Sequence, residues 1–279
     1  MTSLTLVLVL AASFLHAGWN TLVKTAEDRF AAGSLVMIAG GLFALPLMPA
    51  VPVPNAAAWS YLLASIVIHV AYVAFLAKAY TAGDLGHVYP LARGTGPLLL
   101  ALVSIPLGEG LATVPLVGVF AVSLGVISLA WRPLAQRHDG ARPVAYALAT
   151  GVMIAAYSYV DGHGTRAAGE PLSYITWMMV LGAIVFGALL AVTRRDSIVA
   201  TVRRDVWKIL ASGLLAGGAY GVVLWTMTLA PIAAVAALRE VSVVIAVLIG
   251  TILLKEPFGW RRGGAAVLVA GGIVLLATG

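Results

Sequence analysis

Charged residues interrupt this sequence only at wide intervals, and long apolar stretches lie between them. A helix needs about 20 apolar residues to cross the roughly 30 Å hydrocarbon core of a bilayer. Hydrophobic residues make up 61% of the chain and charged residues 10%, whereas ordinary soluble domains carry about 25% charge. Because a soluble core of this length could not bury so much apolar surface, the sequence predicts an all-α membrane protein.

Breaks at charges, prolines and glycines divide the apolar sequence into ten predicted transmembrane helices. The two least distinct separations fall at Gly83–Asp84 and Ala230–Pro231, where a single continuous helix would overshoot the bilayer. No basic residue precedes the first segment, so we expect a span there and not a cleaved signal peptide. The predicted spans are Leu4–Val23, Ala32–Ala50, Trp59–Tyr80, Leu85–Pro106, Val114–Trp131, Pro143–Val160, Leu172–Thr193, Val206–Leu229, Ile232–Leu254 and Phe258–Ala277.

The longest connector, the basic stretch 132–142, separates two units of five spans each, residues 1–131 and 143–279. The units share residues at matching places, which indicates an internal duplication. Because five is an odd number, a duplicated second unit would enter the membrane upside down. Such inverted repeats are typical of alternating-access carriers, which bind their solute near the midplane. The matching residues include Trp59 and Tyr72, which recur 148 positions later as Trp207 and Tyr220, and Glu109, which recurs 147 positions later as Glu256.

Basic residues gather on one side of the predicted layout. The opposite side carries only Arg166. By the positive-inside rule the basic side is cytoplasmic, so both termini are predicted outside the cytoplasm, and we expect a bacterial cytoplasmic (inner) membrane. The basic side holds 14 of the 17 Lys and Arg residues: Lys24, Arg29, Lys78, Arg132, Arg137, Arg142, Arg194, Arg195, Arg203, Arg204, Lys208, Lys255, Arg261 and Arg262.

The net charge of +6 therefore indicates contact with lipid headgroups, and no basic run is long enough to suggest a nucleic-acid partner. The chain has no cysteine, which excludes disulfides, thiolate metal sites and cysteine nucleophiles. We predict no cofactor and no metal site.

Five short motifs, in this order and spacing, resemble the EamA-type family of the drug/metabolite transporter superfamily, whose members consist of two fused five-span units. The resemblance extends over the whole chain. It implies carriage of a small solute, often its export, within a family whose solutes range from amino acids and sugars to nucleotide conjugates and drugs. The motifs are His16-Ala17-Gly18-Trp19-Asn20, Tyr89-Pro90-Leu91-Ala92-Arg93-Gly94-Thr95-Gly96-Pro97, Gly108-Glu109, Leu238-Arg239-Glu240-Val241-Ser242 and Lys255-Glu256.

Arg93 and Arg239 lie inside the fourth span of each unit, at corresponding places. A charge at that depth costs at least ~2.5 kcal/mol unless it faces water or a partner. The pair can grip a carboxylate or phosphate through the planar guanidinium fork, or each arginine can be a structural cation. Glu240 is then either a proton-coupling carboxylate or the ion-pair partner of Arg93, and we favour the ion pair.

His16 and His69 lie inside spans 1 and 3, where histidine can relay protons or form a neutral hydrogen bond between helices. Asp84 and Asp161 fall at span ends, so we expect them at the level of the headgroups.

Trp19 and Tyr157 occupy equivalent places in spans 1 and 6, with Asn20 beside Trp19. They either line a solute cavity or belong to an interfacial aromatic belt. Tyr89 opens the proline- and glycine-rich stretch that ends at Pro97. That stretch predicts either a broken helix beside the solute or a simple kink.

Together these features favour a secondary transporter of a small organic solute, an exporter or exchanger for an anionic or amino-acid-like substrate, acting as a monomer or homodimer. The sequence contains no G-x-x-x-x-G-K-[ST] loop, so we expect transport to be driven by a gradient, by exchange or by a partner subunit. The alternatives are an integral-membrane enzyme that acts on lipid, for which H-E-x-x-H and aspartate-rich motifs are missing, or a non-transporting scaffold.

Overall fold

The apolar stretches fold into helices, ten of them α-helices in the part of the chain described here, with two short 3-10 helices at Leu45–Ala50 and Ala56–Ala58. The computed structural model describes residues 1–130, 141–245 and 260–279, and for residues 17–25, 85, 195–197, 200 and 261 the backbone alone. The α-helices are α1 (Ser3–Thr25), α2 (Arg29–Ala44), α3 (Trp59–Ala82), α4 (Leu85–Ser104), α5 (Thr113–Ser128), α6 (Arg142–Ala167), α7 (Pro171–Thr193), α8 (Arg195–Thr226), α9 (Ile232–Arg239) and α11 (Trp260–Thr278).

Five helical segments among the described residues are long and apolar enough to cross a membrane. Helix α4 is not one of them, because glycines, two prolines and Arg93 lie between Leu85 and Pro97. The all-α membrane class is therefore confirmed, while ten crossings stay a prediction. The five segments are Arg29–Ala50, Ala56–Ala82, Arg142–Ala167, Pro171–Thr193 and Thr201–Thr226, and shorter apolar helices cover Ser3–His16, Thr113–Ser128 and Arg262–Thr278.

Large apolar side chains point outward from these helices. Val67 on α3 is 69% exposed and Ile184 on α7 is 61% exposed. Water would penalise so much exposed apolar surface, whereas lipid tails do not. This outer surface agrees with a protein whose surroundings are lipid.

The two least distinct helix boundaries are confirmed. Helix α3 ends at Ala82, and α4 begins at Leu85 after Asp84, whose carboxylate accepts a hydrogen bond from the Gly86 N–H. That contact is an N-cap, which satisfies a backbone donor left free at the start of a helix. Helix α8 ends at Thr226, and α9 begins only after Pro231.

A turn interrupts the predicted ninth span, whereas the proline- and glycine-rich stretch of the fourth span is not interrupted. Helix α4 stays helical through Pro90 and Pro97, so the broken-helix alternative for that stretch is wrong. Helix α9 instead ends at Arg239, Glu240 forms a turn, and residues 241–245 are helical again. The remainder of the predicted ninth span, 246–254, lies outside the described residues. An interruption of this kind at membrane depth is tolerated only where protein or a water-filled cavity surrounds it.

Helix α9 is the centre of the bundle, and every one of its residues is buried. A helix that is apolar on all sides packs stably only with protein around it. The helix therefore delivers the two charged residues at its end, Arg239 and Glu240, into the protein interior.

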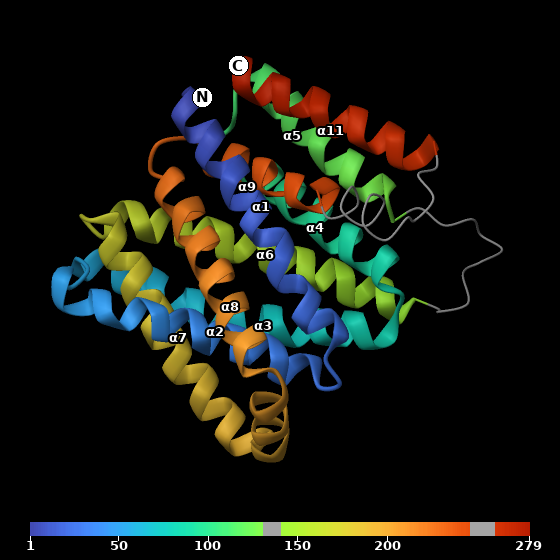
Figure 1. Ribbon diagram of the computed structural model, residues 1–279. Helices are drawn as coiled ribbons and strands as arrows, with labels where there is room; N and C mark the ends of the chain where they lie inside the picture. The colour runs from blue at the N-terminus through green and yellow to red at the C-terminus, as the bar shows by residue number, and fades with distance from the viewer. Residues whose placement is uncertain (131–140, 246–259) are drawn as a thin grey trace.

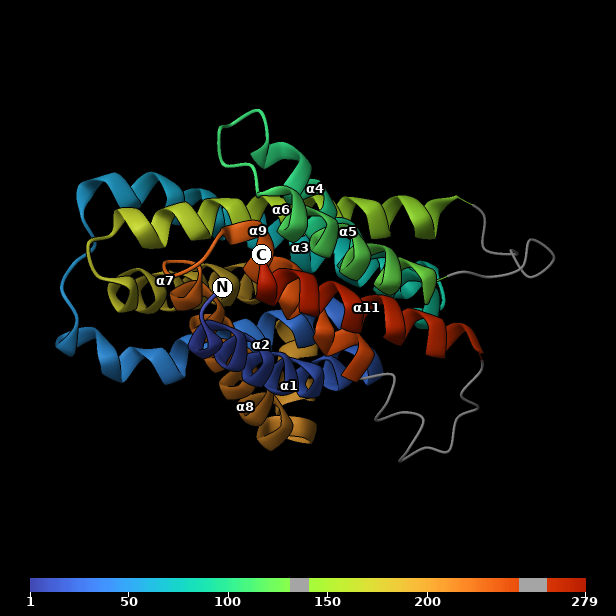
Figure 2. The ribbon, with the colours of Figure 1, turned by 90° about the horizontal axis from the view of Figure 1, so that it is seen from above.

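Helices at corresponding places in the two units pack against one another: α2 against α7, α4 against α9 and α5 against α11. The contact of α3 with α6 is likewise matched by that of α1 with α8. Figure 1 and Figure 2 show α5 and α11 side by side in both views, and the two chain ends at the same end of the bundle.

Glycines allow α4 to approach α6 closely. A Cβ at Gly96 would lie 2.4 Å from the Ile154 side chain, and one at Gly151 would lie 2.8 Å from the Thr95 side chain. Contacts that short do not occur in real structures, so the crossing requires glycine on both helices. This crossing fixes the depth of Arg93, which lies one turn before Gly96.

Candidate functional site

Three charged side chains meet at the centre of the bundle. Arg93 of α4 lies 2.7 Å from Glu240, between Nε and Oε2, and Arg239 lies 3.5 Å from the same carboxylate, between Nη2 and Oε1. The side chains of Arg93, Arg239 and Glu240 are 2%, 1% and 0% exposed. The Arg93 Nε–H does not point at the oxygen, so this contact is an ion pair and not a linear hydrogen bond.

Two guanidinium groups therefore share one carboxylate. Among the described residues, Nη2 of Arg93 and both Nε and Nη1 of Arg239 have no hydrogen-bond acceptor. Buried polar groups are normally satisfied, and each exception needs a physical explanation. This cluster carries one net positive charge and several N–H groups that are available to an oxyanion.

Aromatic rings surround the two arginines. The Arg239 guanidinium lies over the Tyr157 ring, 5.5 Å from its centroid, and the Arg93 guanidinium lies 6.0 Å from the centroid of the Tyr89 ring. The Tyr157 ring also stacks on the His69 ring with centroids 4.6 Å apart. Each guanidinium thus makes a cation–π contact with a tyrosine ring, and such a contact stabilises the cation by about 0.5–2 kcal/mol.

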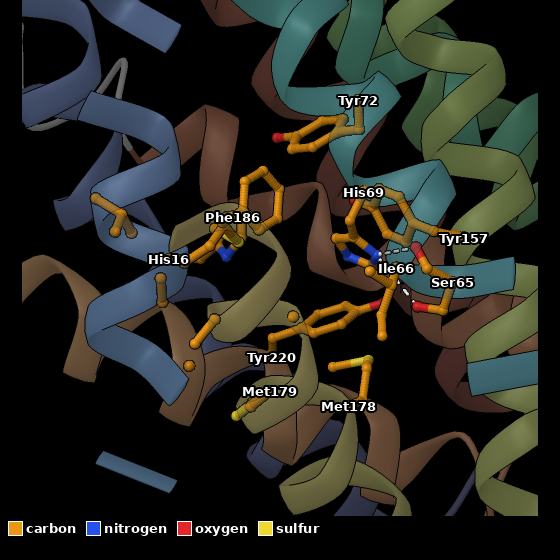
Figure 3. Close-up of a pocket in the computed structure, with 16 residues that line it drawn as sticks. His16, Ser65, Ile66, His69, Tyr72, Tyr157, Met178, Met179, Phe186 and Tyr220 are labelled. Carbon is orange, nitrogen blue, oxygen red and sulfur yellow. Dashed lines mark hydrogen bonds between the residues drawn. The ribbon is translucent and has the colours of Figure 1, made fainter. Parts of the chain in front are cut away.

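A cavity of about 90 Å³ adjoins this cluster, walled by helices α1, α2, α3, α6, α7 and α8. Its polar members include His16, His69, Tyr157 and Tyr220, and Figure 3 shows these side chains around one space, with Ser65 bonded to His69. Pockets for small organic ligands usually measure about 300–1,000 Å³, so this cavity is too small for such a solute without opening.

The arginines and Glu240 do not line the cavity. Tyr157 does, and it contacts Arg239 as well as His69. The Tyr157 ring therefore separates the aromatic cavity from the charged cluster.

A larger cleft of about 1,160 Å³ opens on the side predicted to be cytoplasmic. Helices α2, α3, α6, α7 and α8 line both spaces: on α3, Tyr72 lines the cavity and Lys78 the cleft. Buried Phe186 on α7 lines the cavity at the end nearest the cleft. The cleft thus leads toward the cavity along five shared helices. Its rim is polar, and Asp28 and Arg194 form an ion pair across it with Oδ2 and Nε 3.4 Å apart.

The structure brings seven of the nine predicted site residues into one region: Arg93, Arg239, Glu240, Tyr89, Tyr157, His16 and His69. Trp19 and Asn20 belong to α1, but their side chains lie outside the described residues. Among the residues that the structure describes, no group of three or more His, Cys, Asp or Glu side chains is arranged to hold a metal ion.

A second acid, Asp161, is buried within the protein, which the sequence analysis did not predict. Asp161 lies inside the helix and not at its end: α6 continues to Ala167, and the Asp161 side chain is 0% exposed. Its carboxylate accepts hydrogen bonds from the hydroxyl groups of Tyr174, at 3.0 Å, and Tyr220, at 2.5 Å. The i, i+4 spacing of Tyr157 and Asp161 puts both on one helix face, a signal that the sequence did contain.

Comparison with known proteins adds a family and a fold. Residues 142–278 match the profile of the EamA-like transporter family. No curated protein sequence matches the chain significantly. A crystal structure of a protein at 18% sequence identity superposes with a TM-score of 0.76, covering 99% of this chain and 96% of that one. At that identity the likeness establishes the fold alone.

Proposed function

Residues 142–278 are an EamA-like transporter family domain, and from this membership and the central cluster we propose that the chain is a secondary transporter of a small organic anion. Family membership implies a membrane transporter. It favours transport over the lipid-modifying enzyme and the non-transporting scaffold that the sequence left open. The solute class is our own inference, and the two buried arginines carry it.

The observation that carries the proposal is the ratio of two buried guanidiniums to one carboxylate. A structural ion pair is complete with one cation and one anion, so Arg93 and Glu240 alone would satisfy that need. Arg239 is surplus to it, and its free N–H groups face the same interior. A carboxylate, sulfonate or phosphate of the solute would supply a second anion in direct contact with the arginines and the missing acceptors.

The aromatic cavity suits the organic part of such a solute. Tyr72, Tyr157, Tyr220 and Phe186 offer ring faces and edges, and Met178 offers an adaptable apolar wall. With the small cavity and the wide cleft, the structure resembles a carrier whose central site is closed while its cytoplasmic vestibule is open. In this proposal, movement of Tyr157 joins the cavity to Arg239, and transport is driven by a gradient or by exchange, in an exporter or exchanger.

We further propose that residues 1–131 and 143–279 are inverted repeats, joined by the connector 132–142, with both termini outside the cytoplasm. The pairing of α2 with α7, α4 with α9 and α5 with α11 supports this arrangement. Elements next to a two-fold axis contact their own symmetry mates, and these three pairs do so. The equivalence of α3–α6 and α1–α8 supports it in the same way.

A ligand screen by thermal unfolding tests the solute class. The probes are benzoate, benzenesulfonate and phenyl phosphate, with benzamide and benzenesulfonamide as neutral counterparts and benzylamine as the cation. A ligand at 100 times its Kd stabilises the folded state by about 2.7 kcal/mol. We expect the anions alone to raise the melting temperature, and Arg93→Lys to reduce the shift because the planar fork is lost. Stabilisation by benzylamine or the amides only, or an anion effect that survives Arg93→Lys unchanged, would overturn the proposal.

A further inference from the structure

Asp161 is a second interior carboxylate that the anion site does not use. Both of its oxygens accept a tyrosine hydroxyl, from Tyr174 at 3.0 Å and from Tyr220 at 2.5 Å. Among the described residues, no basic side chain forms an ion pair with it. A carboxylate withdrawn from water without a cation is expensive to maintain, and in transmembrane segments such residues mark ion or proton pathways.

A chain of ring contacts connects Asp161 to the charged cluster. The Tyr220 ring, which also lines the cavity, lies 5.8 Å from the Tyr157 ring between centroids, and Arg239 lies over that Tyr157 ring. The helices that pack against α6 place several titratable or charged groups near this series of rings. They are His69 and Tyr72 of α3, Arg93 and Tyr89 of α4, Tyr174 of α7, Tyr220 of α8 and Arg239 of α9.

The buried charges of the cluster and of Asp161 balance. Arg93 and Arg239 contribute two positive charges, and Glu240 and Asp161 contribute two negative ones when both acids are ionised. A monovalent anion that binds between the arginines leaves the interior with one net negative charge. In a low-dielectric interior that excess is unfavourable, and uptake of one proton removes it.

Asp161 is the acid best placed to take that proton. Glu240 is held by both guanidiniums, and neutralising it would leave them without their counter-ion. His69 already contacts Ser65 through Nδ1, and its ring stacks on the same Tyr157 ring as Arg239. A further positive charge there would be repelled by the guanidinium. When Asp161 is protonated on Oδ2, it loses the hydrogen bond from Tyr220 and keeps the hydrogen bond that Tyr174 donates to Oδ1.

We propose that Asp161 is the coupling carboxylate of this carrier, taking up one proton from water when a monovalent organic anion binds at Arg93 and Arg239. The inference rests on the proposed function, because it needs an anion at that site. A hydronium ion transfers its proton to Oδ2 of Asp161 and leaves as water. Tyr220 then ceases to donate to that oxygen and turns its hydroxyl toward the cavity. The anion and the proton cross together, and the step is electroneutral.

Proton uptake on binding tests this directly. The purified full-length chain in weakly buffered detergent solution is titrated with benzenesulfonate, which stays ionised at every pH used, while a pH dye and calorimetry record protons and binding. We expect about one proton taken up per anion bound. Asp161→Asn should bind benzenesulfonate within a few-fold of the wild-type affinity and take up none. Glu109→Gln, which removes a partly exposed acid at the end of the bundle, is the matched control and should leave the uptake unchanged.

Two further variants separate Asp161 from its neighbours. At saturating benzenesulfonate, His69→Gln should still take up about one proton per bound anion, even where the affinity for the anion changes. Tyr220→Phe should keep the same ratio while shifting its pH dependence, because one hydrogen bond to the carboxylate is lost. Binding without uptake in the wild type would overturn the coupling and leave the proposed function standing. If Asp161→Asn still takes up a proton when the anion binds, or if His69→Gln binds the anion without taking one up, then a group other than Asp161 accepts the proton. Absence of any benzenesulfonate binding would remove the anion site and this inference together.

Discussion

Glu240 is the one carboxylate that contacts both buried arginines in the described structure, so it should be the most sensitive member of the cluster. Glu240→Gln leaves two neighbouring guanidiniums without a counter-ion. Arg93→Gln removes the closer cation, but Glu240 keeps Arg239 at 3.5 Å. We therefore expect Glu240→Gln to destabilise the protein more than Arg93→Gln does.

The size of the difference follows from the burial of the pair. Removing one partner of a buried ion pair costs about 3–5 kcal/mol. Because Glu240→Gln leaves two buried cations that repel one another, we expect it to lower the free energy of unfolding by about 5 kcal/mol. For Arg93→Gln we expect a loss of about 3 kcal/mol. For chains of this size each kcal/mol lowers Tm by about 2–4 °C, so the losses are about 10–20 °C and about 6–12 °C.

Thermal unfolding of the detergent-solubilised single mutants and of the double mutant Arg93→Gln/Glu240→Gln measures the coupling. The double mutant removes one charge of each sign but leaves Arg239 on the Tyr157 ring without Glu240. Its loss of stability should therefore lie between those of the two single mutants, and well below their sum. Arg204→Gln is the control: this half-exposed arginine also pairs with acids, and because exposed ion pairs contribute little, its loss should leave Tm almost unchanged. Losses that add to within about 0.5 kcal/mol in the double mutant would refute the pairing.

Three further predictions concern the scaffold. Gly151→Ala should cost about 1–3 kcal/mol by overpacking, because its Cβ would lie 2.8 Å from Thr95, whereas Gly187→Ala, with nothing within 4 Å, should be neutral in the same unfolding assay. Arg166→Gln should lower stability by about 1.5–3 kcal/mol, since its guanidinium donates to the Met227 and Ala230 carbonyl oxygens at the end of α8, and anion affinity measured by calorimetry should not change. A cysteine placed at Gly110 should react in intact cells with a membrane-impermeant maleimide, while one at Thr193 should react only after lysis; the opposite pattern would invert the predicted orientation.

Helix positions could be predicted because they depend on composition alone. Lipid admits helices of a narrow range of lengths, so charges and prolines mark their ends, as at Asp84 and Pro231. The break after Arg239 could not be predicted in the same way. Proline and glycine in α4 suggested a break there, but close packing on α6 keeps α4 helical, whereas the turn at Glu240 is stabilised by ion pairs between segments far apart in the sequence.

From the sequence, site residues could be predicted only where a charged residue interrupts an apolar run. Arg93, Arg239 and Glu240 stood out because a charge inside an apolar run is costly. Asp161 did not, because it follows the apolar run and its two tyrosine partners come from α7 and α8. Contacts between helices decide whether an acid at the end of such a run meets water or the interior, and one sequence does not record them.

The central claim, that the arginine cluster binds the transported anion, is tested most directly by counterflow. Proteoliposomes loaded with unlabelled benzenesulfonate are diluted into labelled benzenesulfonate, and accumulation of the label reports exchange through the carrier. We expect transient accumulation by the wild type, inhibition by benzoate but not by benzamide, and strongly reduced exchange by Arg93→Lys in correctly folded protein. Exchange that persists undiminished in folded Arg93→Lys, or that benzamide blocks as well as benzoate does, would contradict the claim.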